Sequence, residues 1–265
     1  MIGRQLVVTG GVLFVIAACS TTGVEDELLV SAAASLTDAL AEIEGVFEDA
    51  NPGVVVVLNL GSSSALREQI LEGAPADVFA PANIPNMEQV SEAGEVAGEA
   101  EIFVTNSLQI AVPEGNPARI TGLEDFAREE LVIGLCAEDV PCGEFGRQAL
   151  ASAGVTPSID TNEPDVRALL TKIEAGEIDA GITYVTDVIS TGGVVGGLDI
   201  PEEDNVVAEY PIAVLAGARN PEEAAAFVEF VLSEEGQAIL TGYGFASVSP
   251  PEGGSTAGGG EGGSD

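Results

Sequence analysis

A regular alternation of short apolar segments with amphipathic segments restricts the fold of this chain more than any other feature. Residues 54–60 read VVVVLNL, a β-branched run typical of a central strand. Leu36, Leu40, Ile43 and Phe47 recur instead at the spacing of one helix face. In this part of the chain the expected strands cover residues 28–33, 54–60 and 77–80, and the expected helices cover residues 36–49, 65–72 and 87–93. This β-α-β-α-β order predicts a parallel sheet with helices on both faces.

Two long extended segments, residues 101–113 and 206–216, interrupt the alternation. Around them the pattern resumes, with expected strands at residues 131–135 and 180–184 and expected helices at residues 123–129, 143–153, 165–175 and 221–232. We therefore predict an α/β fold of two parallel-sheet lobes joined by two extended hinge segments. The first lobe would comprise residues 28–104 and 213–249, and the second lobe residues 105–212. Ligands of such folds bind outside the carboxyl ends of the strands, which here means the cleft between the lobes.

The two ends of the chain differ in composition from a folded domain. Residues 1–18 contain one basic residue, Arg4, and then an uncharged apolar run that ends in small residues, which predicts a signal peptide rather than a membrane span. Cys19 follows directly, as in a bacterial lipobox, so we expect it to be lipidated; ordinary signal cleavage beside an incidental cysteine is the alternative. Residues 19–27 would form a tether, and the Gly/Ser/Glu-rich residues 250–265 a disordered tail.

The chain is strongly acidic, with 44 acidic and 8 basic residues and a formal net charge of −36. Nucleic acid is excluded as a natural partner, because no basic patch could neutralise phosphates. The acidic residues are dispersed, which indicates a solvated acidic surface. Such a surface repels anions, so any anion site on this chain must overcome the repulsion locally.

Cys136 and Cys142 are the only cysteines besides Cys19. In an oxidising compartment a pair that closes a short loop indicates a disulfide. A zinc site is a poor alternative, because two thiols supply only half of the usual ligands and the chain has no histidine.

Four stretches place small or polar residues where a predicted strand ends and a helix begins: residues 32–38, 61–64, 140–143 and 163–167. Helix N-termini present free N–H groups and a partial positive charge, so they bind anions without a cationic side chain. Ser35 and Ser63 would add hydroxyl donors, and Tyr184, at the end of its strand, a phenol. Taken singly these residues suit ordinary helix caps or the core. Two stretches in each lobe, however, would meet if the lobes closed.

Catalytic groups are scarce. Without histidine, Ser-His-Asp and Cys-His arrangements are impossible. Lys172, the sole lysine, lies in an amphipathic helix pattern that indicates a solvated face rather than a Schiff base. Paired carboxylates leave a secreted hydrolase open as an alternative, although the chain has no tryptophan to line a sugar cleft. We therefore predict a binding protein and not an enzyme, with no cofactor.

Several of these segments, in their order and spacing, resemble the periplasmic molybdate-binding proteins of ABC importers. The resemblance covers nearly all of residues 28–248. Its motifs are residues 32–37 (AAASLT), 61–64 (GSSS), 70–79 (ILEGAPADVF), 106–108 (NSL), 140–143 (VPCG), 165–167 (DVR), 181–184 (GITY), 210–213 (YPIA) and 243–245 (YGF). It implies a two-lobed periplasmic-binding-protein fold of type II, a monomer that captures molybdate or tungstate outside the cytoplasm, and ABC permease subunits as partners.

The resemblance also implies a ligand set. Two serines, two backbone amides and a tyrosine hold the anion in that family, and the matching positions are Ser35, Ser63, the amides of Cys142 and Val166, and Tyr184. A cysteine at position 142 departs from the usual small residue, which puts the local loop geometry in doubt.

Other ligands remain alternatives within the binding class. The ligands that compete with molybdate are tungstate, sulfate, phosphate, ferric iron and small organic anions. A site made only of donors favours a fully deprotonated dianion, because a protonated oxygen would face another donor. This argument disfavours phosphate near neutral pH but does not separate sulfate from molybdate. Iron is disfavoured because Tyr184 is expected to have no second tyrosine beside it.

Overall fold

The computed structural model describes residues 26–248 of the chain. The predicted signal peptide, Cys19 and the predicted tail at residues 250–265 lie outside these residues. Within the described part, no helix combines the length and the apolar character needed to cross a membrane.

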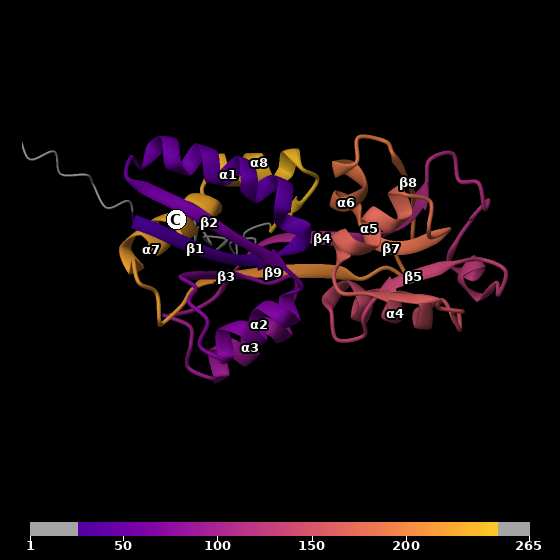
Figure 1. Ribbon diagram of the computed structural model, residues 1–265, viewed down its shortest axis with the longest axis horizontal. Coiled ribbons are helices and arrows are strands. Elements are labelled where there is room, and N and C mark those ends of the chain that lie inside the picture. The colour runs from indigo at the N-terminus through magenta and orange to yellow at the C-terminus, as the bar shows by residue number, and fades with distance from the viewer. Residues whose placement is uncertain (1–25, 249–265) are drawn as a thin grey trace, which may run out of the picture.

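The first lobe is built on three parallel strands, with β1 in the middle. The strands are β1 (Asp26–Ala33), β2 (Val54–Gly61) and β3 (Val78–Ala80), and the helices that follow them are α1 (Thr37–Ala50), α2 (Ser63–Leu71) and α3 (Ile84–Glu92). The chain returns to this lobe with α7 (Pro221–Leu232) and α8 (Glu234–Gly242), which pack on α1. Figure 1 shows α1 and α8 on one face of the sheet and α2 and α3 on the other.

The second lobe repeats this plan. Its parallel strands are β5 (Ile133–Cys136), β6 (Thr161–Glu163) and β7 (Ala180–Tyr184), and its helices are α4 (Pro141–Ser152), α5 (Val166–Glu174) and α6 (Val185–Ser190). The helix predicted at residues 123–129 is a short 3-10 helix, η2 (Leu123–Ala127). The sequence patterns did not predict β6, α6, β8 (Val195–Asp199) or β10 (Ala246–Ser247).

Two long strands connect the lobes, as the extended segments predicted. They are β4 (Glu101–Pro113) and β9 (Val207–Val214), which pair with each other in antiparallel register. Strand β9 continues antiparallel to β3 and β4 continues antiparallel to β7, so one path of strands runs β2-β1-β3-β9-β4-β7-β5-β6 (Figure 1). The two-lobed α/β prediction is confirmed. Each lobe's sheet is mixed rather than purely parallel, because the connecting strands run against the direction of the other strands.

The apolar core follows the predicted periodicity. In α1 the side chains of Leu40, Ile43 and Phe47 are buried, and Phe47 meets Phe227 of α7 edge-on at 5.2 Å between ring centroids. Burying one such side chain fully contributes about 1.5–3 kcal/mol. All five residues of β7 are buried, as expected for a strand covered on both faces. Residues at or just after the carboxyl ends of β1, β2, β5, β6 and β7 meet between the lobes.

Candidate functional site

A small cavity lies between the two lobes, with a volume of about 20 Å³. It is lined by residues of both lobes: Ala34, Ser35, Gly61, Ser62, Ser63, Ala82, Val140, Pro141, Cys142, Asp165, Val166 and Tyr184. All five residues that the sequence singled out as anion ligands are among them. Each lies within a residue or two of the junction between a strand or loop and a helix, so the cavity is the meeting point of several helix N-termini.

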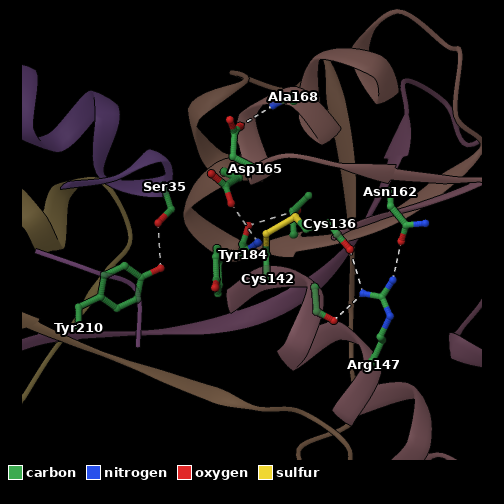
Figure 2. Close-up of a disulfide and its surroundings, with 12 residues drawn as sticks. Ser35, Cys136, Cys142, Arg147, Asn162, Asp165, Ala168, Tyr184 and Tyr210 are labelled. Atoms are coloured by element: carbon green, nitrogen blue, oxygen red, sulfur yellow. Dashed lines mark hydrogen bonds between the residues drawn. A yellow bond between two sulfur atoms is a disulfide. The ribbon is translucent and has the colours of Figure 1, made fainter. Parts of the chain in front are cut away.

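Ser35 belongs to a short 3-10 helix, η1 (Ala34–Leu36), between β1 and α1. Its side chain is buried, and its Oγ lies 2.9 Å from the hydroxyl oxygen of Tyr210 on β9 (Figure 2). Either hydroxyl can donate in this pair. When Tyr210 donates, the proton of Ser35 is free to point into the cavity.

Ser63 is the first residue of α2 and is also buried. Its Oγ accepts a hydrogen bond of 2.9 Å from the backbone N–H of Ala82, which itself lines the cavity. Because a serine hydroxyl has one proton, this arrangement leaves the proton of Ser63 available to a ligand. The neighbouring Ser62 is the N-cap and accepts from the N–H of Ala65 at 3.3 Å.

The second lobe contributes two helix N-termini. Cys142 lies in the first turn of α4, after Pro141, and Val166 is the first residue of α5. N–H groups in a first helical turn have no carbonyl partner within their own helix, and they carry the positive end of the helix dipole. The amides of Cys142 and Val166 are therefore suited to bind an anion.

Cys142 is joined to Cys136 by a disulfide, with the Cα atoms 5.8 Å apart (Figure 2). Arg147 braces the same loop, because its Nη1 donates to the carbonyls of Cys136 at 2.8 Å and Gly143 at 2.9 Å. The sulfur of Cys142 is therefore buried in the disulfide, and the residue still lines the cavity. The unusual cysteine at this position is compatible with an N–H contact.

Tyr184 ends β7, and its ring is buried with 1% of its surface exposed. Its hydroxyl makes no hydrogen bond of normal geometry within residues 26–248, although the Tyr210 hydroxyl lies close to it and the residue lines the cavity. Burial raises the pKa of this hydroxyl well above its usual value, and nearby Tyr210 and Asp187 raise it further. Tyr184 is therefore a neutral donor, and leaving a buried donor unpaired costs about 1–3 kcal/mol.

No lysine or arginine is among the residues that line the cavity. Asp165, the one carboxylate there, caps its own helix by accepting from the N–H of Ala168 at 2.9 Å. Arg167 lies nearby but bonds to Asp38 and to the carbonyl of Ala34. The cavity therefore presents hydroxyl and amide donors rather than cationic side chains.

One expectation about this site is wrong: Tyr184 does have a second tyrosine beside it. The ring centroid of Tyr210 is 6.1 Å from that of Tyr184, and the Tyr210 hydroxyl holds Ser35. Tyr210 was missed as part of the site because its contact joins residues 175 positions apart in the sequence, which no local pattern encodes. The amide of Ala82, which donates to Ser63, was also missed, because this contact joins two segments of the first lobe that are 19 positions apart in the sequence.

Two α/β lobes, joined by two strands around a small donor-lined cavity, define a two-lobed solute-binding protein. The model of the bacterial extracellular solute-binding protein family matches residues 28–246, and the chain belongs to this family.

Known proteins of this kind are similar along most of the chain. The molybdate-binding protein ModA of Mycobacterium tuberculosis is 38% identical over 219 residues, which cover 83% of this chain and 84% of the relative. Among solved structures, the periplasmic molybdate-binding protein of Azotobacter vinelandii has a TM-score of 0.74 at 20% identity, covering 84% of this chain and 99% of that one. The sulfate-binding protein SubI of M. tuberculosis has a TM-score of 0.77 at 20% identity, covering 85% and 88%. These two structural likenesses bear on the fold alone.

Proposed function

We propose that this protein captures a tetrahedral oxyanion, molybdate or tungstate, in the interlobe cavity and delivers it to the permease subunits of an ABC importer. The observation that carries this proposal is the buried hydroxyl of Tyr184, which faces the cavity without a hydrogen-bond partner in the described residues. A bound oxyanion would supply the missing acceptor.

The ligand set would be the hydroxyls of Ser35, Ser63 and Tyr184 and the backbone N–H groups of Cys142 and Val166. Ser63 has its acceptor role filled by Ala82, and Ser35 can have its own filled by Tyr210, so both can donate outward. Five donors around one anion suit a fully deprotonated dianion. Hydrogen bonds to a charged partner contribute about 1.5–3 kcal/mol each, which is how a neutral site on an acidic protein binds an anion.

The competing ligands have weaker support. The relative that is 38% identical along most of the chain is named a molybdate-binding protein, which supports molybdate over sulfate. Ferric iron prefers several anionic oxygen ligands. Tyr184 and Asp165 are the only phenol and carboxylate among the lining residues, and Tyr210 bonds to Ser35 instead. Molybdate and tungstate have the same shape and charge, and both belong to the proposal.

A role in binding rather than catalysis agrees with the family and with the chemistry of the cavity. The lining groups are neutral donors and one helix-capping carboxylate, and no pair of acid and base side chains faces the space. A secreted hydrolase is the remaining alternative in another class. We propose that the protein acts without a cofactor and as a monomer.

Calorimetric titration of the secreted form with molybdate, tungstate and sulfate tests the proposed function. Molybdate and tungstate are expected to bind, and Ser35→Ala and Ser63→Ala each to weaken binding about tenfold or more, since each removes a charge-assisted donor. Ser91→Ala makes the same chemical change at an exposed position of α3 and serves as the matched control. Sulfate binding as tight as molybdate binding would overturn the assignment of the ligand, and no binding of any oxyanion would overturn the function.

For the rest of the chain we propose secretion through residues 1–18, lipidation of Cys19 and a tether that is shorter than the predicted residues 19–27, because β1 already begins at Asp26. Lobes of residues 28–104 with 213–249 and of residues 105–212 would follow, with residues 250–265 as a disordered tail. The motif at Cys19 supports a protein held at the outer face of the membrane, where it can meet an importer.

Changing Cys19 to alanine in a native-like host tests the anchor. Because the thiol is the acceptor of the lipid, Cys19→Ala is expected to move the protein from the membrane fraction into the soluble fraction, or to stop its maturation. Fractionation followed by immunoblotting measures this shift, with Ser20→Ala as the neighbouring control. Unchanged membrane association of Cys19→Ala would contradict lipidation.

A further inference from the structure

We propose that Arg167 is an interlobe latch, a positioning residue that holds the cleft closed and so sets how slowly the oxyanion leaves. This inference rests on the proposed function. Arg167 itself is not among the residues that line the cavity, so its effect would be exerted through closure rather than through contact with the ligand.

The guanidinium of Arg167 has partners in both lobes. In the first lobe its Nε donates to the carbonyl of Ala34 at 3.3 Å, and its Nη2 donates to the carboxylate of Asp38. In its own lobe its Nη1 donates to the Oγ of Ser190 at 3.1 Å, and its Nε lies 3.9 Å from Oδ1 of Asp187. One rigid group with several donors therefore joins the start of α1 to α5 and α6.

The position of these contacts links them to the ligand. Ala34 precedes Ser35, and Arg167 follows Val166, so the latch joins the residues next to one proposed ligand from each lobe. Closing the latch brings the hydroxyl of Ser35 and the amide of Val166 toward the same anion. Because only the closed arrangement offers the full donor set, the ligand selects that arrangement and the latch contributes to its stability.

The carboxylates around Arg167 also support its role in holding the lobes together. Asp38 of the first lobe and Asp187 of the second both lie against the guanidinium of Arg167, and Asp38 and Asp165 are both close enough to Asp187 to act on its charge. Without the guanidinium, these carboxylates would repel one another across the cleft and favour opening. When the guanidinium is present, an acidic group of each lobe interacts with the same cation, which favours the closed arrangement.

Asp187 is an alternative partner for the guanidinium of Arg167 when the lobes separate. Its carboxylate is fully buried, its Oδ2 accepts from the N–H of Tyr184 at 3.0 Å, and its Oδ1 has no hydrogen-bond partner in the described residues. Since α5 and α6 belong to one lobe, Asp187 moves with Arg167 on opening. The 3.9 Å gap between them would then close, and Arg167 would exchange Ala34 and Asp38 for Asp187. Such an exchange between two defined sets of partners is the two-state element that hinge closure requires.

Stopped-flow kinetics with molybdate test the latch. The protein has three tyrosines and no tryptophan; Tyr184 lines the cavity and Tyr210 packs beside it, so tyrosine fluorescence reports on the cleft. Arg167→Gln is expected to raise the dissociation rate constant about tenfold while the association rate constant changes little, because encounter precedes closure. Arg167→Lys keeps the charge but not the multiple donors, so it should restore part of the slow dissociation.

Two further variants keep the experiment decisive. Arg128→Gln removes an equal charge in the second lobe and should leave dissociation unchanged, because within residues 26–248 the ion pairs of Arg128 are with Asp125 and Glu130 of the same lobe. Asp38→Asn, at a partly exposed position, tests the same contact from the first lobe if Arg167→Gln folds poorly. The double variant should dissociate no faster than Arg167→Gln alone, since both changes break one interaction.

Small-angle scattering then separates a latch from a merely structural role. With saturating molybdate, Arg167→Gln should keep a larger radius of gyration than the parent protein, while the two ligand-free proteins match. Equal dissociation rates and equal ligand-bound radii for Arg167→Gln and Arg128→Gln would overturn the latch while leaving oxyanion binding intact. Absence of oxyanion binding by the parent protein in calorimetry would overturn the proposed function, and the latch with it.

Discussion

Tyr184→Phe is expected to change stability and binding in opposite directions. In the ligand-free protein the buried hydroxyl of Tyr184 has no hydrogen-bond partner in the described residues, so removing it relieves a cost of about 1–3 kcal/mol. For a domain of this size about 2–4 °C of melting temperature corresponds to 1 kcal/mol, so the ligand-free variant should melt a few degrees higher than the parent. The same change removes a donor to the anion and should weaken molybdate binding about tenfold or more.

Scanning calorimetry without ligand and titration with molybdate measure the two effects. Tyr243→Phe is the matched control, because the hydroxyl of Tyr243 lies at the surface and donates to Glu42 at 2.9 Å. It should leave binding unchanged and should not raise the melting temperature. A Tyr184→Phe variant that is less stable and binds molybdate as the parent does would show that the hydroxyl is satisfied within the protein and is not a ligand.

Tyr210→Phe distinguishes the role of the Tyr210 hydroxyl from that of the Tyr184 hydroxyl. Its hydroxyl bonds to Ser35, and its ring packs edge-on against Phe245 with 5.6 Å between centroids. Removing a satisfied buried hydroxyl lowers stability, so this variant should melt lower than the parent, in contrast to Tyr184→Phe. Removal of a buried hydroxyl is expected to raise the melting temperature only where that hydroxyl has no hydrogen-bond partner.

The sequence predicted the fold correctly in segments whose buried residues recur at the regular spacing of a strand or a helix. Alternation of apolar segments located β7 to the residue and both connecting strands closely, because buried strands and amphipathic helices must repeat their apolar positions. It failed for β8, which reads VGGLD, because two glycines leave no apolar pattern to detect. It also failed for α6, whose six residues are fewer than two helical turns.

The candidate site was predictable to a similar degree. Helix N-termini have sequence signals, so the stretches around Ser35, Ser63, Cys142 and Val166 could be located, and the structure brings all four to one cavity with Tyr184. The contacts that orient these groups, from Tyr210 to Ser35 and from Arg167 to Asp38, join residues more than a hundred positions apart. Such contacts depend on how the lobes meet, which no local pattern encodes.

Asp187 is expected to make the stability of the protein depend on pH near neutrality. Burial raises the pKa of this carboxyl from 3.8 to about 7, and the cation of Arg167 and the N–H of Tyr184 offset that effect only in part. Asp38 and Asp165 raise the pKa further. In the unfolded chain the group returns to its ordinary value. The folded protein therefore holds the proton more strongly than the unfolded chain.

The sign of the pH effect follows from this difference. The stability contributed by protonated Asp187 is fully present below pH 3.8 and is lost as the pH rises through about 7. A tenfold change in a proton dissociation constant corresponds to about 1.4 kcal/mol, so between pH 5 and pH 8 the loss should amount to about 3 kcal/mol. Asp187→Asn carries no titrating proton at this position and should be spared this loss.

Urea unfolding of the parent protein and Asp187→Asn at intervals from pH 5 to pH 8 measures the effect. Repulsion among the many surface carboxylates also grows with pH, but it is common to both proteins and cancels in the difference between their free energies of unfolding. Relative to the parent, Asp187→Asn should gain stability as the pH rises from 5 to about 7 and then level off. Asp139→Asn makes the same change at an exposed position and should run parallel to the parent. A constant difference between the parent and Asp187→Asn across the range would mean that the carboxyl is already ionised in the folded protein at pH 5, with Arg167 compensating its burial fully.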